Sequence, residues 1–135
     1  MDRQTSLSDA QLAPDAAIAA LDAAWRAGDT RERERLLERA LAPEAELIGP
    51  EPVGRHVGVS AIAALIGGFA ERWPGAQVVV TTGVDTHHGW ARYGWAIRDA
   101  SGKPLLEGID VVETAPDGRL RRVVMFYNVS LPTPG

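Results

Sequence analysis

The chain has 135 residues, of which 45% are hydrophobic and 24% are charged, and its formal net charge is -4. These figures predict one globular domain that is large enough to bury a core without disulfides. The absence of cysteine excludes a disulfide framework, a thiolate zinc site and a cysteine nucleophile, and it favours a cytoplasmic protein. No apolar run approaches the ~20 residues of a membrane span, and the acidic balance disfavours nucleic acid as a partner. A small molecule is therefore the expected partner.

Three amphipathic helices are predicted in the first half of the chain, because apolar residues recur there every three or four positions. They occupy residues 14–27, 29–41 and 60–73. The charged residues 31–39 of the second helix are interpreted as a solvated face, because alternating Arg and Glu usually only favour solubility. In the third helix, the pair Gly67-Gly68 indicates close backbone packing or clearance for a neighbouring group.

The segment between Pro43 and Gly58 is predicted to be a shaped loop, because its many Pro and Gly residues leave room for only a short strand at 46–48. After Gly75 the hydrophobic period changes to that of strands. Four strands are expected, at residues 77–86, 91–98, 105–114 and 120–128.

Three helices followed by an antiparallel meander predict an α+β domain whose helices cover one face of a curved sheet. We expect a single domain at residues 14–130, with flexible ends at residues 1–13 and 131–135.

Both faces of the predicted sheet are apolar. On one strand, Ala91, Tyr93, Trp95 and Ile97 share the face that we expect to look toward the helices. On the last strand, apolar residues lie on both faces: Val123, Met125 and Tyr127 on one side, Val124 and Phe126 on the other. A sheet that is apolar on both faces needs two covers, which predicts a homodimer formed through the sheet.

Asp110 is the anomaly of the strand at 105–114. It lies among Ile109, Val111 and Val112, an unusual environment for a charged group. Desolvation there would raise the pKa of its carboxyl and let it exchange a proton near neutral pH, so Asp110 is our candidate catalytic residue. The alternative is a structural role, in which Asp110 makes a buried salt bridge or accepts backbone hydrogen bonds.

His87 and His88 are the second candidate pair, and they lie near a strand end. Adjacent residues on a strand face opposite ways, so the two cannot bind one metal ion together, and no metal site is predicted. One of them could line the cavity as a proton carrier; the alternative is a simple histidine beside a turn.

Aromatic and thioether side chains are the predicted wall of a cavity for a hydrophobic ligand. They are Trp25, Phe69, Tyr93, Trp95, Met125 and Tyr127. The alternative is that these side chains are ordinary core residues.

Several short motifs, in this order and spacing, carry a family resemblance. They are Trp25-Arg26-Ala27-Gly28-Asp29, Gly58 before Ser60-Ala61-Ile62, Arg92-Tyr93-Gly94-Trp95, Glu107-Gly108-Ile109-Asp110, and Asp117-Gly118-Arg119-Leu120 followed by Phe126. Over residues 14–129 the chain resembles the nuclear transport factor two-like (NTF2-like) superfamily, which includes SnoaL-like polyketide cyclases and ketosteroid isomerase. The resemblance implies a cone-shaped, cystatin-like roll.

The resemblance also implies roles for particular positions. Ketosteroid isomerases use a neutral aspartic acid and a tyrosine as donors to an oxyanion, while a second aspartate moves the proton. Asp110 falls where the family keeps the donating acid, but Gly49 stands at the position of the base and Leu21 at that of the tyrosine. Steroid isomerisation by that route is therefore not expected. Limonene epoxide hydrolase-like chemistry is not expected either, because Gly108 stands where an Arg would be sought.

The leading hypothesis is a SnoaL-like domain that binds a hydrophobic carbonyl compound, with Asp110 as general acid or base and His87 or His88 as proton partner. Such an enzyme would be a cofactor-independent isomerase, cyclase or hydrolase. The alternative, from a different class, is a non-catalytic ligand-binding or dimerisation module of the same fold.

Overall fold

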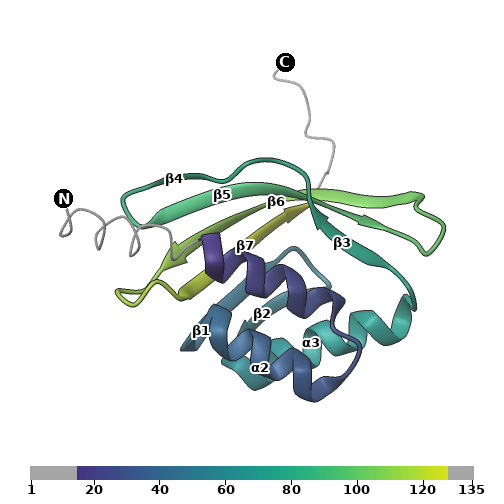
Figure 1. Ribbon diagram of the computed structural model, residues 1–135, viewed down its shortest axis with the longest axis horizontal. Helices are drawn as coiled ribbons and strands as arrows, with labels where there is room; N and C mark the ends of the chain where they lie inside the picture. The colour runs from purple at the N-terminus through teal and green to yellow at the C-terminus, as the bar shows by residue number, and fades with distance from the viewer. Residues whose placement is uncertain (1–14, 128–135) are drawn as a thin grey trace.

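The computed structural model describes residues 15–127. The flexible ends predicted at 1–13 and 131–135 lie outside the described residues. Three helices cover one face of a curved sheet, as Figure 1 shows: an N-terminal helix (residues 15–26), α2 (Thr30–Ala40) and α3 (Val59–Arg72). The predicted α+β class and its cone-like arrangement are confirmed. Within residues 15–127, no helix has the length and apolar character needed to cross a membrane.

The start of α2 follows from its sequence. Asp29 is the N-cap, and its carboxylate accepts a hydrogen bond of 2.8 Å from the backbone N–H of Glu32. This bond satisfies one of the backbone donors that every helix leaves unpaired in its first turn. The helix then ends at Ala40, and the chain continues directly into a strand.

Seven strands of residues 15–127 form one sheet. They are β1 (Leu41–Gly49), β2 (Gly54–Val57), β3 (Gln77–Val80), β4 (Asp85–His87), β5 (Trp90–Arg98), β6 (Pro104–Thr114) and β7 (Leu120–Tyr127). The order is β2-β1-β7-β6-β5-β3, and β4 also pairs with β5. The predicted meander corresponds to β5, β6 and β7, which are antiparallel neighbours. One pair, β1 with β7, is parallel, so the sheet is mixed.

The segment at 43–58 was predicted to be a loop with a short strand at 46–48. That strand lies inside β1, but the rest of the segment forms a hairpin of β1 and β2, so the prediction of a loop was wrong. Pro43 lies inside β1, but the pairing of β1 with β7 is irregular between Leu41 and Glu46. A proline without an N–H donor is tolerated at such an interruption. The breakers between Gly49 and Gly54 then form the turn of the hairpin.

The strand predicted at 77–86 is split into β3 and β4, which both pair with β5. Between them, the hydroxyl of Thr82 accepts a 2.7 Å hydrogen bond from the backbone N–H of Gly94. Because a side chain takes the place of a backbone acceptor there, the strand is interrupted at this point.

The predicted inner face of β5 is confirmed. Ala91, Tyr93, Trp95 and Ile97 are all buried in the core beneath the helices. Because side chains alternate along a strand, Asp110 of β6 also points inward, where it stands directly opposite Tyr93 in the register.

One residue contradicts the predicted solvated face of the second helix. Most of the charged side chains at 31–39 are exposed, but Arg33 is buried. It lies four residues before Leu37 and seven before Ala40, so it falls on the same stripe of α2 as these two buried residues. Alternating charge hid this spacing in the sequence.

Candidate functional site

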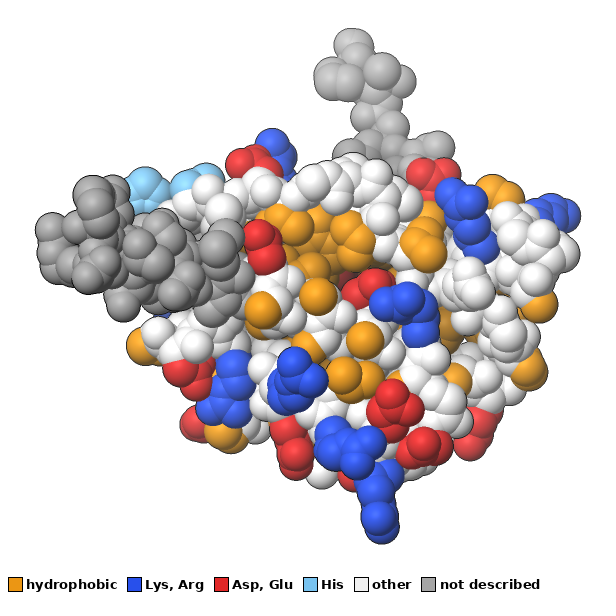
Figure 2. Space-filling view, in the orientation of Figure 1, with side chains coloured by type: hydrophobic (Ala, Val, Ile, Leu, Met, Phe, Trp, Pro, Cys, Tyr) orange, Lys and Arg blue, Asp and Glu red, His pale blue; other side chains and the backbone are white. Residues whose placement is uncertain are grey.

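A narrow pocket lies between the N-terminal helix and the inner face of the sheet. Its lining residues are Leu21, Asp22, Trp25, Val78, Val80, Tyr93, Trp95, Ile97, Asp110 and Met125. Figure 2 shows a hollow with hydrophobic side chains on this side of the molecule. The pocket and its mouth hold about 370 Å³ of empty space, of which only about 30 Å³ admits the centre of a water-sized sphere. The pocket is therefore narrow.

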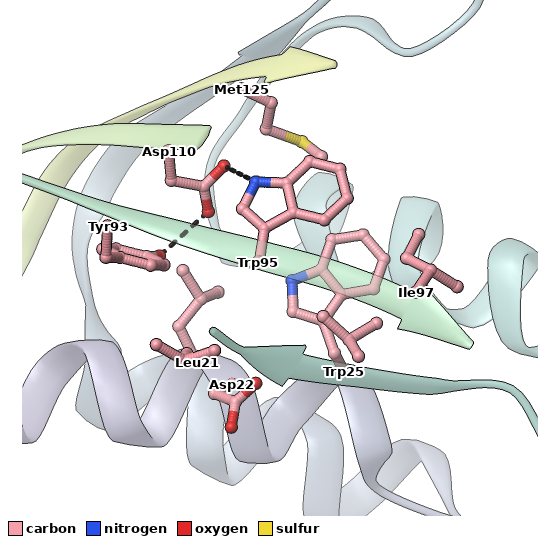
Figure 3. Close-up of a pocket in the computed structure, with 10 residues that line it drawn as sticks. Leu21, Asp22, Trp25, Tyr93, Trp95, Ile97, Asp110 and Met125 are labelled. Atoms are coloured by element: carbon pink, nitrogen blue, oxygen red, sulfur yellow. Dashed lines mark hydrogen bonds between the residues drawn. The ribbon is translucent and has the colours of Figure 1, made fainter. Parts of the chain in front are cut away.

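Asp110 is held at the wall of this pocket by two side-chain donors. The Tyr93 hydroxyl donates a 2.9 Å hydrogen bond to Oδ2, and the Trp95 indole N–H donates a 2.8 Å hydrogen bond to Oδ1. Figure 3 shows the carboxyl group between these two rings. The carboxyl thus has a fixed orientation, and both donors come from the neighbouring strand β5.

Gly108 makes the bond from Trp95 possible. It stands opposite Trp95 in the register, two residues before Asp110 on the same face of β6. A Cβ atom at this position would lie 2.4 Å from Cζ2 of the Trp95 ring, well inside contact distance. Because glycine lacks this atom, the indole packs closely against β6 and its N–H reaches the carboxyl group.

Burial raises the pKa of the Asp110 carboxyl to about 7, although the hydrogen bonds from Tyr93 and Trp95 act in the opposite direction. Burial and the adjacent Asp110 carboxylate together hold the pKa of the Tyr93 hydroxyl well above its ordinary value. Tyr93 therefore stays a neutral donor, while Asp110 exchanges its proton near neutral pH. This is the range in which a general acid or base is most effective.

Asp22 is a second carboxylate at the pocket, and the sequence analysis missed it. Its side chain is partly buried, and Arg26 donates a 3.0 Å hydrogen bond to it from the next turn of the helix. Burial raises the pKa of Asp22, and the Arg26 charge partly offsets this effect. A single acid on an amphipathic helix carries no signal by itself, so the sequence did not single out Asp22.

Four of the six predicted wall residues line the pocket: Trp25, Tyr93, Trp95 and Met125. Phe69 does not, because it packs edge-to-face behind Trp25 with ring centroids 5.5 Å apart. The side chain of Tyr127, the last residue of β7, lies outside the described part of the structure.

The structure does not bring His87 or His88 to the pocket. Both side chains are exposed, and their Nδ1 atoms lie 3.1 Å apart. His88 and Gly89 have φ values of 51° and 81°, the pattern of a tight turn between two strands. The pair therefore sits at the β4–β5 turn, away from Asp110.

The two positions that the family resemblance assigns to the isomerase base and tyrosine, Gly49 and Leu21, carry no polar side chain. Leu21 lines the pocket with an aliphatic side chain. A Cβ atom at Gly49 would lie 2.9 Å from Val53, so this position leaves little room for a base. Within residues 15–127, no group of three or more His, Asp or Glu side chains is arranged to hold a metal ion.

Comparison with solved structures places this geometry among known folds. A candidate isomerase of the SnoaL-like family from Agrobacterium tumefaciens str. C58 is 26% identical, with a TM-score of 0.79 over 87% of this chain and 98% of that one. A protein with a cystatin-like fold from Methylobium petroleophilum PM1 is 19% identical, with a TM-score of 0.73 over 90% of this chain and 79% of that one.

A candidate ketosteroid isomerase from Kribbella flavida DSM 17836 is 21% identical, with a TM-score of 0.64 over 94% of this chain and 86% of that one. No protein-family model matches the chain, and no curated protein matches it. The predicted resemblance to SnoaL-like and NTF2-like proteins is confirmed by these structures, at the level of the fold.

Proposed function

We propose that this protein binds a small hydrophobic carbonyl compound in the pocket and transfers a proton on it through Asp110. The observation that carries the proposal is the buried carboxyl group, fixed by Tyr93 and Trp95, with a pKa of about 7. The apolar side chains around it favour a hydrophobic ligand.

The proton moves between the ligand and Asp110. In its ionised form the carboxylate takes a proton from the carbon next to the carbonyl group. The electrons of that C–H bond form the C=C bond of an enolate, and the carbonyl oxygen gains negative charge. The protonated Asp110 then donates to the Tyr93 oxygen, which frees the phenolic O–H to stabilise that charge. In a ligand whose deprotonated carbon also adjoins a C=C bond, the charge extends to the far carbon of that bond, and return of the proton to that carbon completes an isomerisation.

The test needs no knowledge of the natural substrate. The probe 2-tetralone has acidic hydrogens next to its carbonyl group, and proton NMR in D₂O follows their exchange with solvent. We expect the protein to accelerate this exchange and the Asp110→Asn variant to lose about 10² of the acceleration or more.

The matched control is Asp85→Asn, which removes an exposed carboxylate that pairs with Arg92 on the sheet surface. We expect it to retain the full rate. Equal rates for the original protein and folded Asp110→Asn would rule out the proposed role of Asp110, and circular dichroism establishes that the variant is folded.

The second candidate function is a non-catalytic binding module, and the narrowness of the pocket favours it. Only about 30 Å³ admits the centre of a water-sized sphere, so a bulky ligand enters only if side chains move. In that case 2-tetralone binds, as titration calorimetry would detect, but its hydrogens exchange no faster than in buffer.

We also propose that a second copy of the chain covers the outer face of the sheet, in a protein that we expect in the cytoplasm. Ile109 and Phe126 are cross-strand neighbours on the face away from the helices, and they are 48% and 54% exposed. An apolar pair this exposed favours a partner surface.

Light scattering coupled to gel filtration tests the proposed dimer. We expect Phe126→Asp to convert a dimer into a monomer. Val57→Asp, at an exposed residue of edge strand β2, is the control that should leave the dimer intact. A monomeric original protein would overturn the proposal.

A further inference from the structure

Arg33 is a buried cation without a carboxylate partner among residues 15–127. Its side chain is 5% exposed. Nη2 donates a 2.8 Å hydrogen bond to the carbonyl oxygen of Ala27, but Nε has no hydrogen-bond partner within the described part of the chain. The bond to Ala27 satisfies a carbonyl at the end of the N-terminal helix, which is an ordinary capping role. It uses one of five N–H donors, so it does not account for the whole guanidinium group.

An open groove lies against this guanidinium. It holds about 820 Å³ of empty space, open solvent included, roughly twice the 370 Å³ of the Asp110 pocket by the same measure. The lining residues are Trp25, Arg26, Ala27, Gly28, Arg33, Phe69, Ala70, Trp73, Gly75, Ala76 and Gln77. Two arginines and three aromatic rings are among them, whereas no acidic side chain of the described chain lines the groove.

The position of Arg33 is costly without an anion. It occupies the buried stripe of α2, where an apolar side chain would pack with Leu37. It also lies near the N-terminus of that helix, where the helix dipole disfavours positive charge. Gly67 of α3 lies close to the same guanidinium group, because a Cβ atom there would lie 3.5 Å from Nη1 of Arg33. This is an ordinary contact distance, and a Cβ atom at Gly68 would meet nothing within 4 Å, so the close packing or clearance predicted for the glycine pair is not observed.

An arginine cannot remove this cost by losing its proton, because its charge persists at all ordinary pH values. A carboxylate in the groove would supply the missing negative charge and hydrogen-bond acceptors. The aromatic side chains of Trp25, Phe69 and Trp73 would pack against a flat apolar body.

We propose that this groove is a second binding site, which takes a small aromatic carboxylic acid with its carboxylate on Arg33. The site is separate from Asp110, so it stands whether or not the pocket is catalytic. Trp25 lines both the groove and the pocket.

The test compares two probes of the same shape, 2-naphthoate and its neutral amide 2-naphthamide. Titration calorimetry with the full chain at pH 8 measures both affinities. We expect 2-naphthoate to bind at least about tenfold more tightly, because only the acid carries the charge that Arg33 lacks.

Arg33→Met is the informative variant, because methionine has a similar helix propensity and fits an apolar stripe. We expect it to lose the preference for 2-naphthoate while its melting temperature without ligand equals or exceeds that of the original protein. Arg35→Met, on the exposed side of the same helix, is the matched control and should change neither property. Asp110→Asn should keep the preference, which separates the groove from the pocket.

Three results would overturn the proposal. These are no binding of 2-naphthoate up to about 10 mM, equal affinities for the acid and the amide, and an unchanged preference in Arg33→Met. If Arg33→Met does not fold, the comparison of the two probes on the original protein decides, together with Arg33→Lys. We expect the lysine variant to retain only part of the preference for the acid. A lysine variant with the full preference would contradict a role for the guanidinium group.

Discussion

Asp110 and Arg33 are the two charged side chains that the described residues bury, at 7% and 5% exposure, and their surroundings differ. Both oxygens of Asp110 accept hydrogen bonds, whereas Nε of Arg33 has no partner within residues 15–127. Asp110 lies in a tight pocket, whereas Arg33 lies beside a wide groove. An acid with a raised pKa can become neutral, so its burial costs little at low pH, but an arginine must find an anion. The comparison teaches that burial alone does not define a site; the partners of the buried charge do.

The largest expected effect concerns the pH dependence of stability. The pKa of Asp110 is about 7 in the folded chain and near its ordinary value of about 3.9 when unfolded. Between these values the folded state binds more protons, so the contribution of Asp110 to stability is present at low pH and is lost as the pH rises toward 7. We expect the stability of Asp110→Asn, relative to the original protein, to increase by roughly 4 kcal/mol from pH 4 to pH 7.5.

Urea unfolding at several pH values measures this difference. The Asp85→Asn variant is the control, because Asp85 is exposed on the sheet edge. A difference between Asp110→Asn and the original protein that stays constant with pH would mean that Asp110 does not titrate in this range.

The next effect concerns the close approach of Trp95 to Gly108, which allows the indole N–H to reach Asp110. Gly108→Ala places a methyl group against the Trp95 ring and against the carbonyl of Phe126. We expect a loss of about 3 kcal/mol in the free energy of unfolding, because overpacking a core position forces side chains and backbone to shift. Gly83→Ala is the control, since a Cβ atom there has open space around it. Urea unfolding of both variants checks this, and a neutral Gly108→Ala would contradict the close approach.

A smaller effect isolates one hydrogen bond. Trp95→Phe removes the N–H donor to Oδ1 of Asp110, and this bond lowers the pKa of the acid. We expect the pKa of Asp110 to rise by about one unit, equivalent to about 1.4 kcal/mol. Carbon NMR of the Asp110 carboxyl follows the titration. Trp73→Phe, at an exposed residue of the groove, should leave that pKa unchanged.

The smallest effect concerns the two glycines of α3, of which Gly67 lies beside Arg33. Gly68→Ala adds a methyl group in open space on α3, so we expect a gain of about 0.5–1 kcal/mol from helix propensity. Gly67→Ala should gain a similar amount, because its methyl group would lie 3.5 Å from Nη1 of Arg33, an ordinary contact distance. Chemical denaturation of the two variants measures both gains, and a loss of stability in Gly67→Ala alone would contradict this expectation.

The fold could be predicted from the sequence in segments where the apolar residues follow a single period, either that of a helix or that of a strand. The three helices and the strands β5, β6 and β7 follow from apolar spacing and turn residues. The hairpin of β1 and β2 was missed, because Pro43 reads as a breaker until its irregular pairing with β7 is known. That pairing joins segments far apart in the chain, which local sequence patterns do not reveal.

The candidate site was predictable in part. Asp110 stood out because it interrupts an apolar run, and the alternation of β5 placed Tyr93 and Trp95 on the same side. Asp22 was missed because one acid on an amphipathic helix carries no signal by itself. Arg33 was missed because its charged neighbours are exposed and its own burial depends on which face of α2 meets α3.

The position of Trp25 limits how the two hollows can change independently. Its indole forms a wall of both the pocket and the groove, and Phe69 supports it from behind. Any substitution at this position reshapes two hollows at once. A substitution of Trp25 that suits a new ligand in one hollow therefore also changes the other, so the two proposed sites are coupled through one ring.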